Sequence, residues 1–469
     1  MLVSIRRVLV PLLVALGLCA LAFTARAQAP ALDAIYRADA DRLIQAALTD
    51  SFGWKRLATL TDRFGHRLSG SQALENSIDW ALGEMRRDGL QNVRGEPVMV
   101  PHWVRGEESA ELLLPRRVPL HMIGLGGSVG TPAGGITADV IVVTSEAELA
   151  ARGAEARGKI ILFDVPFTTY GETVRWRSLG AIAAAKAGAA AALIRSVSSF
   201  SMQNPHTGGM RYYDTTVARL PAAAISVEDA MMLHRMQDRG ERIQLRLSMG
   251  ARTLPDARSR NVVAEIVGHE RPDEVVVISG HLDSWDVGTG AMDDAGGSVA
   301  AWEAVRLMQR LGLRPRRTVR VVLWTNEENG LRGGTGYRDA HRAQLDKHVL
   351  AIESDNGVFR PNGFRFQGSD AALATMRQVA RLLEPIGATK MDRGPADADV
   401  GPMIALGVPG LGLDVDGTKY FWYHHSNADT IDKLDPQEFA KCVAAMAVAA
   451  YVVADMPGTL PREVPAAGL

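Results

Sequence analysis

Five short segments of the chain carry histidines and carboxylates in patterns that could bind metal ions. They lie far apart in the sequence, and several directly follow an apolar run that predicts a β-strand. In chain order they are Gly280-His281-Leu282-Asp283, residues 290–297 with Asp293 and Asp294, Thr325-Asn326-Glu327-Glu328, Ser354-Asp355, and residues 423–430 with His424 and His425. Because ligands of open α/β sheets collect at the carboxyl ends of strands, we expect these side chains to meet at one sheet edge.

The residue types suit a borderline divalent cation such as zinc, which accepts histidine and carboxylate ligands. Two such ions about 3.5–4 Å apart could share one carboxylate and one water molecule, and the pair would lower the pKa of that water. Glu327 and Glu328 are adjacent at a strand end and therefore point in different directions. One of them can bind metal while the other acts on the water as general base.

Each pattern alone has a simpler explanation. A histidine and an aspartate at a strand end usually form a hydrogen-bonded pair, and two adjacent aspartates often cap a helix. Adjacent glutamates or adjacent histidines commonly lie in solvated loops. One shared site explains all five segments together better than five unrelated coincidences at one sheet edge.

The elements that would position these residues alternate between strand and helix from residue 261 onward. The apolar strand runs are nearly continuous, as expected for a sheet covered on both faces. We therefore predict an α/β fold with a mainly parallel mixed sheet and helices on both faces. The predicted strands cover 262–267, 274–279, 318–324, 349–353 and 410–413, and the predicted helices cover 295–309, 371–383 and 436–453.

The region before residue 261 divides into two parts. Residues 33–95 have apolar positions at helical spacing, whereas residues 110–250 contain short apolar runs separated by Gly and Pro. The second part predicts a small β-rich unit with a helix at 181–189, which we interpret as a lid, with a spacer as the alternative. The predicted parts are a helical section at 28–109, an insertion at 110–253 and the main domain at 254–469.

The N-terminal segment has the layout of a secretory signal. A basic start is followed by an apolar run over residues 8–23 and by small residues that end at Ala27. We expect residues 1–27 to be removed, which places the mature protein in the periplasm or outside the cell. An uncleaved anchor is the alternative, although the run is shorter than the roughly 20 residues of a membrane span. Cys19 could mark a lipoprotein, but the bulky Leu18 precedes it.

Composition excludes several classes of protein. The 469 residues are 47% hydrophobic and 22% charged, which is ordinary globular usage. The formal net charge of −1 gives no sign of a nucleic-acid partner or an anionic membrane surface. Without the signal segment only Cys442 remains of the two cysteines, so we expect a disulfide-free fold with this thiol buried in a helix. We also expect no stable membrane insertion of the mature chain.

The metal-binding segments resemble the M28 family of dizinc peptidases, and within it the carboxypeptidase Q branch. The resemblance covers most of the mature chain and also includes local matches outside the five segments. The matching runs are 280–283, 290–297, 324–328, 353–355 and 425–430, together with 101–103, 105–108, 124–127, 156–160, 198–201 and 205–208.

This resemblance implies two zinc ions per chain and a ligand for each. His281 and Asp355 would bind one ion, and Glu328 and His425 would bind the other. Asp293 would bridge both ions. The insertion at 110–253 resembles the protease-associated unit of the family.

The resemblance also implies roles for neighbouring residues. Glu327 would be the general base and acid, and Asp283 would hold the ring of a metal-binding histidine in the right tautomer. His424 and Asp294 are expected to be neighbours rather than ligands. Asp399 lies in a loop where relatives contact substrate, and it could meet a substrate amino group or be an ordinary loop acid.

The activity implied is hydrolysis of unblocked dipeptides or short peptides by a metal-activated water, as a carboxypeptidase or dipeptidase that forms homodimers. An M28 aminopeptidase acting on longer peptides is the alternative with the same metal centre. Other possibilities are a glutaminyl cyclase, which uses one metal, a non-catalytic receptor-like member, and an envelope solute-binding protein. A receptor typically loses ligands, whereas every candidate position is filled here.

Overall fold

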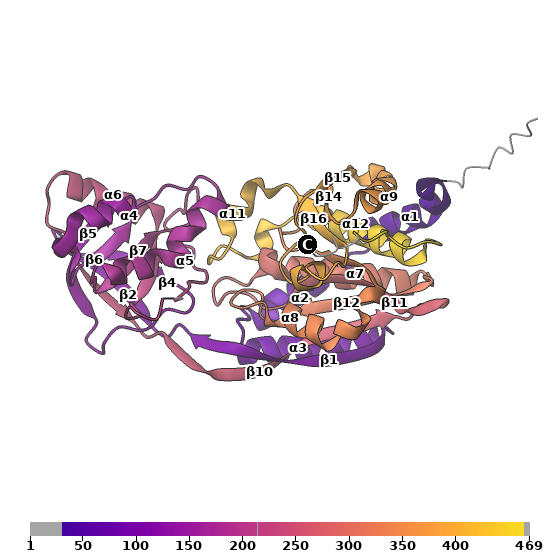
Figure 1. Cartoon of the computed structure of the whole chain (residues 1–469), viewed down its shortest axis with the longest axis horizontal. Coiled ribbons are helices and arrows are strands. Elements are labelled where there is room, and N and C mark those ends of the chain that lie inside the picture. The colour runs from indigo at the N-terminus through magenta and orange to yellow at the C-terminus, as the bar shows by residue number, and fades with distance from the viewer. Residues whose placement is uncertain (1–30, 213, 464–469) are drawn as a thin grey trace, which may run out of the picture.

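The computed structural model describes residues 31–212 and 214–463, so the predicted signal segment 1–27 and Cys19 lie outside the described residues. The described chain forms two lobes (Figure 1). Strands β1 (Gln91–Val104) and β10 (Arg252–Ile266) pair antiparallel along most of their length and run from the larger lobe into the smaller one. This long two-stranded ribbon is one of the connections between the lobes.

The larger lobe is built on an eight-stranded mixed sheet in the order β1-β10-β12-β11-β13-β16-β14-β15. The four strands β12, β11, β13 and β16 are parallel neighbours, so their carboxyl ends lie at the same edge. This arrangement confirms the predicted α/β class with a mainly parallel sheet. The bounds are β11 (Arg271–His281), β12 (Arg317–Trp324), β13 (His348–Glu353), β14 (Pro361–Gln367), β15 (Lys390–Arg393) and β16 (Gly410–Val415).

Helices cover both faces of this sheet. One face packs against helices that include α7 and α12, and the other packs against α8 and α10. On β11, Val276 and Ile278 face the first layer while Val275 and Val277 face the second, because successive side chains of a strand alternate in direction. The bounds are α1 (Leu32–Thr49), α2 (Phe52–Phe64), α3 (Gln72–Arg87), α7 (Gly296–Arg310), α8 (Arg332–Ala340), α9 (Asp370–Arg381), α10 (Gly401–Ile404), α11 (Tyr420–Tyr423) and α12 (Pro436–Asp455).

Helix α12 is the central helix of the first layer. It is the one described helix that is long and apolar enough to cross a membrane, yet 83% of its apolar window is buried inside the protein. Cys442 on this helix is fully buried, and its thiol lies 3.1 Å from the carbonyl oxygen of Phe359. The position agrees with the expectation of a packed thiol in a buried helix.

The smaller lobe has an eight-stranded sheet of its own, in the order β3-β2-β9-β5-β6-β7-β8-β4. Three helices pack on it, so the region is richer in helix than the β-rich unit that we expected. Polar and charged residues occupy several positions of these helices, so the helical spacing of apolar residues is weak in the sequence. The bounds are β2 (Glu108–Leu114), β3 (Val118–Leu120), β4 (Met122–Gly124), β5 (Ile136–Val143), α4 (Glu146–Arg152), β6 (Ile160–Phe163), α5 (Tyr170–Lys186), β7 (Ala191–Arg195), β8 (Ala222–Ile225), α6 (Val227–Asp238) and β9 (Gln244–Met249).

The predicted helical section at 28–109 is partly wrong. Helix α3 ends at Arg87, Gly89 adopts a positive φ of 76°, and strand β1 begins at Gln91. Residues 91–95 lie exposed or half-buried at the outer edge of the sheet, so they lack the apolar run that marks a strand in the sequence. The boundaries at 110 and 253 remain a prediction.

A hydrophobic core is shared between the lobes. Trp103 and Trp285 pack in the same buried cluster as Phe163 and Ile194 of the smaller lobe. A Cβ atom at Gly126 would overlap the indole ring of Trp285, so the absence of a side chain at this position permits the close approach. The smaller lobe therefore packs directly beside the loop that follows β11.

Candidate metal centre

The carboxyl ends of three neighbouring parallel strands bring the predicted residues together. Strand β11 ends at His281, β12 is followed by Glu327 and Glu328, and β13 is followed by Asp355. Because β11 lies between β12 and β13, these side chains share one edge of the sheet. The convergence expected from the sequence is therefore present in the structure.

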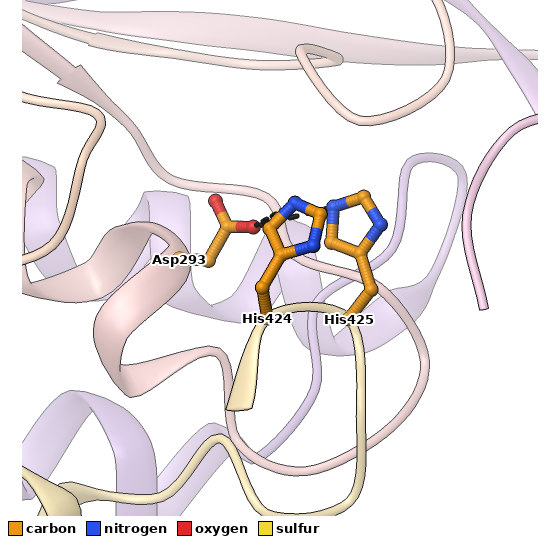
Figure 2. Close-up of side chains that lie close together, drawn as sticks. All are labelled: Asp293, His424 and His425. Atoms are coloured by element: carbon orange, nitrogen blue, oxygen red, sulfur yellow. Dashed lines mark ion pairs between the residues drawn. The ribbon is translucent and has the colours of Figure 1, made fainter. Parts of the chain in front are cut away.

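Asp293 lies at the middle of the cluster. Its Oδ1 atom is 3.2 Å from Nε2 of His281, and its Oδ2 atom is 3.2 Å from Nε2 of His425. The same Oδ2 atom is 3.6 Å from Nε2 of His424 (Figure 2). One carboxylate thus directs separate oxygens toward imidazoles from two different parts of the chain, which is the placement that a ligand shared by two ions requires.

Each side of Asp293 has a further carboxylate. Asp355 Oδ1 lies 3.2 Å from Nε2 of His281, and Glu328 Oε2 lies 3.0 Å from Nε2 of His425. The side chains of His281, Asp293, Glu328 and His425 are less than a tenth exposed. Two His–carboxylate groups therefore meet at one shared aspartate.

His424 lies close to the same aspartate but is less well placed. Its ring stacks on that of His425 with a centroid distance of 3.5 Å, and both rings come from the same loop (Figure 2). His425 contacts both Asp293 and Glu328, whereas the ion pair of His424 is with Asp293 alone. The contacts therefore favour His425 as the ligand.

The charges of the cluster are strongly coupled. Burial opposes the charged form of His281, yet the carboxylates of Asp355 and Asp293 outweigh it and raise the pKa of His281 well above its usual value. Burial likewise disfavours a charged Asp293, but hydrogen bonds from His281 and His425 outweigh it and hold the pKa of Asp293 well below its usual range. A divalent cation would replace the proton on His281 as the partner of these carboxylates.

Glu327 faces the cavity in front of this cluster. Burial raises the pKa of Glu327 well above its usual value, and the nearby Asp355 carboxylate raises it further. No hydrogen bond to the Glu327 carboxylate is found within the described chain, so this group is free to contact a bound water or substrate. Glu328 points away from it toward His425, as adjacent residues at a strand end are expected to do.

Comparison with known proteins agrees with this geometry. The model of peptidase family M28 matches residues 261–450. Carboxypeptidase Q of Mus musculus is 51% identical over 410 residues, which make up 87% of this chain and 87% of the mouse protein. The crystal structure of a peptidase M28 precursor from Shewanella amazonensis SB2B superposes with a TM-score of 0.86 at 38% identity, covering 92% of this chain and 99% of that chain.

The chain belongs to peptidase family M28. It is accordingly a metallopeptidase hydrolase, a zinc-dependent exopeptidase, and the resemblance found in the sequence is confirmed. A zinc aminopeptidase from Bacillus subtilis shares the fold with a TM-score of 0.67 at 18% identity, covering 86% of this chain and 94% of that chain. The buried histidines and carboxylates of this M28 peptidase fit zinc, because their nitrogen and oxygen atoms converge on Asp293 from both sides.

Asp283 supports the centre in two ways, one of which the sequence did not predict. The Nδ1 atom of His281 lies 2.9 Å from the backbone carbonyl oxygen of Asp283, whereas the Asp283 carboxylate is 3.8 Å away. The carbonyl thus favours a proton on Nδ1 and leaves Nε2 available for metal. The carboxylate instead accepts the backbone N–H groups of Glu327 at 3.1 Å and Glu328 at 3.4 Å.

Asp294 has a structural position. Its Oδ2 atom accepts the backbone N–H of His281, and its Oδ1 atom accepts that of Gly297, both at 3.0 Å. A Cβ atom at Gly297 would overlap the Asp294 carboxylate, so the glycine makes this approach possible. Asp294 therefore ties the end of β11 to the beginning of α7, in agreement with its expected place among the neighbours.

Two supporting residues were missed by the sequence analysis. Asp429 accepts the backbone N–H groups of Met292 at 2.7 Å and Asp293 at 3.1 Å, and burial raises the pKa of Asp429 to about 7. Arg67 is fully buried and donates to the carbonyl oxygens of Leu282 at 2.9 Å and Thr289 at 2.7 Å. Asp429 lies in a matching motif and could have been found there, whereas nothing in the sequence around Arg67 marks its role.

Asp399 does not line the cavity. It is fully buried and accepts the backbone N–H of Gly334 at 3.3 Å, whereas Asp397 of the same loop reaches the cavity wall. A direct contact between Asp399 and a substrate amino group is therefore not supported by its position.

The candidate metal-binding residues open onto a cavity of about 950 Å³ between the two lobes. Arg177 of the smaller lobe is buried and donates to the carbonyl oxygen of Thr207 at 3.2 Å and to the hydroxyl of Tyr170 at 2.8 Å. The backbone N–H of Thr207 donates to the carbonyl oxygen of His425 at 2.8 Å. The smaller lobe is thus in direct contact with the loop that carries a candidate ligand.

Proposed function

We propose that this M28 peptidase hydrolyses unblocked dipeptides or short peptides with two zinc ions per chain. The observation that carries the proposal is Asp293, whose two carboxylate oxygens each lie 3.2 Å from a histidine nitrogen on opposite sides. The similarity to carboxypeptidase Q over 87% of the chain supports a substrate of that class.

In this proposal His281 and Asp355 would hold one ion, Glu328 and His425 would hold the other, and Asp293 would serve both. Zinc bound there would polarise the scissile carbonyl and lower the pKa of a water molecule. Three of the proposed ligands lie at or just after strand ends, and Asp294 and Asp283 accept the backbone N–H groups of His281 and Glu328. The site is therefore preorganised before substrate binds.

Glu327 acts as general base in the proposed reaction. Its carboxylate accepts a proton from the attacking water and then passes that proton to the nitrogen of the leaving amine, so the proton balance closes within one turnover. In the chain alone, burial raises the pKa of Glu327. Bound cations would favour the carboxylate form, which is the form that a base needs.

The cavity and the smaller lobe support a small substrate. A volume of about 950 Å³ lies within the range of sites that enclose small molecules, and both lobes contribute to its wall. We also propose that the insertion at 110–253 serves as the lid of this cavity. We further propose that residues 1–27 are removed and that the mature chain is located in the periplasm or outside the cell without membrane insertion. The mature chain forms a homodimer in this proposal.

Glu327→Gln tests the proposal. The amide keeps the size of the side chain but cannot accept the proton, so we expect turnover of a dipeptide to fall by about 10²–10⁴-fold. Zinc content per chain, measured by mass spectrometry of metals, should stay as in the unsubstituted protein. Near-full activity of the variant, or loss of zinc together with activity, would contradict the assignment of Glu327 as a base that does not bind metal.

A further inference from the structure

The wall of the cavity formed by the smaller lobe carries two arginines, Arg211 and Arg219, that have no carboxylate partner within residues 31–212 and 214–463. Both side chains are exposed and both line the cavity whose other end holds the metal-binding residues. Guanidinium groups present several N–H donors in a planar arrangement that matches a carboxylate. Two unpaired guanidinium groups in a substrate cavity therefore offer a site for an anion.

Arg219 is held in place without using its N–H donors. Its guanidinium carbon lies 5.2 Å from the centre of the Tyr212 ring, and the Tyr212 hydroxyl donates to the backbone carbonyl of Leu220. The aromatic face attracts the positive charge and limits the rotamers of the side chain. Its N–H groups consequently remain available to a ligand at a low entropic cost.

The segment that carries Arg211 comes close to the metal centre. A Cβ atom at Gly209 would lie 3.8 Å from the carbonyl oxygen of Glu328, and the N–H of Met210 donates to the carbonyl of Gly126 at 3.0 Å. Arg211 follows two residues later and lines the same cavity as Glu327 and Asp355.

Arg177 lines the same cavity but is not equivalent. Its guanidinium contacts the carbonyl oxygen of Thr207, the hydroxyl of Tyr170 and Nδ1 of His425, and it is only 6% exposed. It positions a loop of the smaller lobe against the loop that carries His425. Arg211 and Arg219 are thus the cationic groups of this wall that a substrate can reach.

We propose that Arg211 and Arg219 bind the free α-carboxylate of the substrate while the scissile bond lies at the metal centre. The inference rests on the proposed function and adds a direction to it. An enzyme with this subsite reads the carboxyl end of a short peptide, whereas an aminopeptidase acting on long peptides has no need of it.

The experiment compares the dipeptide Ala-Leu with its C-terminal amide on the zinc-loaded full chain. For Arg219→Gln we expect kcat/KM on Ala-Leu to fall about 10- to 100-fold, mainly through KM, as for the loss of a charge-assisted hydrogen bond. The same variant should change kcat/KM on the amide by less than about threefold, because the amide lacks the charge. Arg211→Gln should show the same pattern, and Arg219→Lys should recover part of the loss.

Arg246→Gln is the matched control, since this arginine is exposed on β9 of the same lobe and does not line the cavity. Binding of Ala-Leu to the Glu327→Gln variant, measured by calorimetry with and without Arg219→Gln, provides a readout independent of turnover. Thermal melting of each variant checks that the fold is retained.

The outcomes separate the subsite from the proposed function. If both glutamine variants reduce activity on Ala-Leu and its amide equally, or change neither, the carboxylate subsite is wrong. If the unsubstituted protein cleaves the amide as well as the free dipeptide, the subsite is also wrong but the metal chemistry stands. If it cleaves neither, the proposed function itself fails.

Discussion

Replacing Asp293 by Asn should break the metal centre as a unit. The two oxygens of Asp293 each lie 3.2 Å from a histidine nitrogen, one on His281 and one on His425. An asparagine offers one oxygen and an NH₂ group, and the NH₂ group cannot bind a cation. The substitution therefore removes a ligand atom from one ion and the negative charge from both.

The size of the effect follows from the position of Asp293. Loss of a residue that only supports a metal ligand weakens metal binding by about 10–100-fold. Because Asp293 faces both groups directly, we expect at least about a 100-fold loss for one ion. A ligand present at 100 times its dissociation constant stabilises the fold by about 2.7 kcal/mol, so nearly all of that stabilisation should disappear.

The assay is zinc content after dialysis, combined with thermal melting in the presence of zinc and of a chelator. Zinc should raise the Tm of the unsubstituted protein by more than it raises that of Asp293→Asn. Asp294→Asn is the matched control, because both Asp294 oxygens accept backbone N–H groups at 3.0 Å. It should lose about 1–3 kcal/mol of stability with and without zinc. Equal zinc content and equal zinc-dependent stabilisation in Asp293→Asn and the unsubstituted protein would refute the bridging role.

Two further predictions concern pH and the contact between the lobes. Burial disfavours a charged His281, but its carboxylate neighbours outweigh burial and raise its pKa above the unfolded value of about 6.5. In the metal-free protein, the stability that His281 contributes is therefore complete below about pH 6.5 and is lost as the pH rises through the folded pKa. Zinc must displace the proton of His281, so its binding strengthens as the pH rises. Urea unfolding from pH 6 to 8 should therefore show that the stability of the chelated protein falls with pH, while the stabilisation by added zinc increases. A stability of the chelated protein that does not change with pH would contradict this assignment. The new methyl group of Gly126→Ala would overlap the Trp285 ring and should destabilise the protein by about 1–3 kcal/mol. Gly134→Ala is the control, because a Cβ atom there meets no atom within 4 Å. Equal melting temperatures of the two variants would argue against the close packing of Gly126 on Trp285.

Sequence patterns were sufficient for the α/β class because the central strands have strong local signals. All eight residues of β12 are buried, and its second half, residues 321–324, is a continuous apolar run that is easily recognised. Strand β1 lies at the sheet edge with mostly half-exposed residues, and its sequence shows no such signal. The helices of the smaller lobe were also underestimated, since α5 has charged residues such as Arg177 on positions that the fold buries.

The sequence by itself determined the residue types of the metal centre and their order along the chain. Each motif is local, and three of them end or directly follow a strand, so His281, Glu328 and Asp355 could be placed at one sheet edge in advance. Only the tertiary structure decided that the carbonyl of Asp283 fixes the His281 ring, that Arg67 braces the loop after β11, and that Asp399 is buried behind the cavity. These contacts depend on backbone geometry and on the packing of segments that are distant in the sequence. A local pattern of residues encodes neither of these.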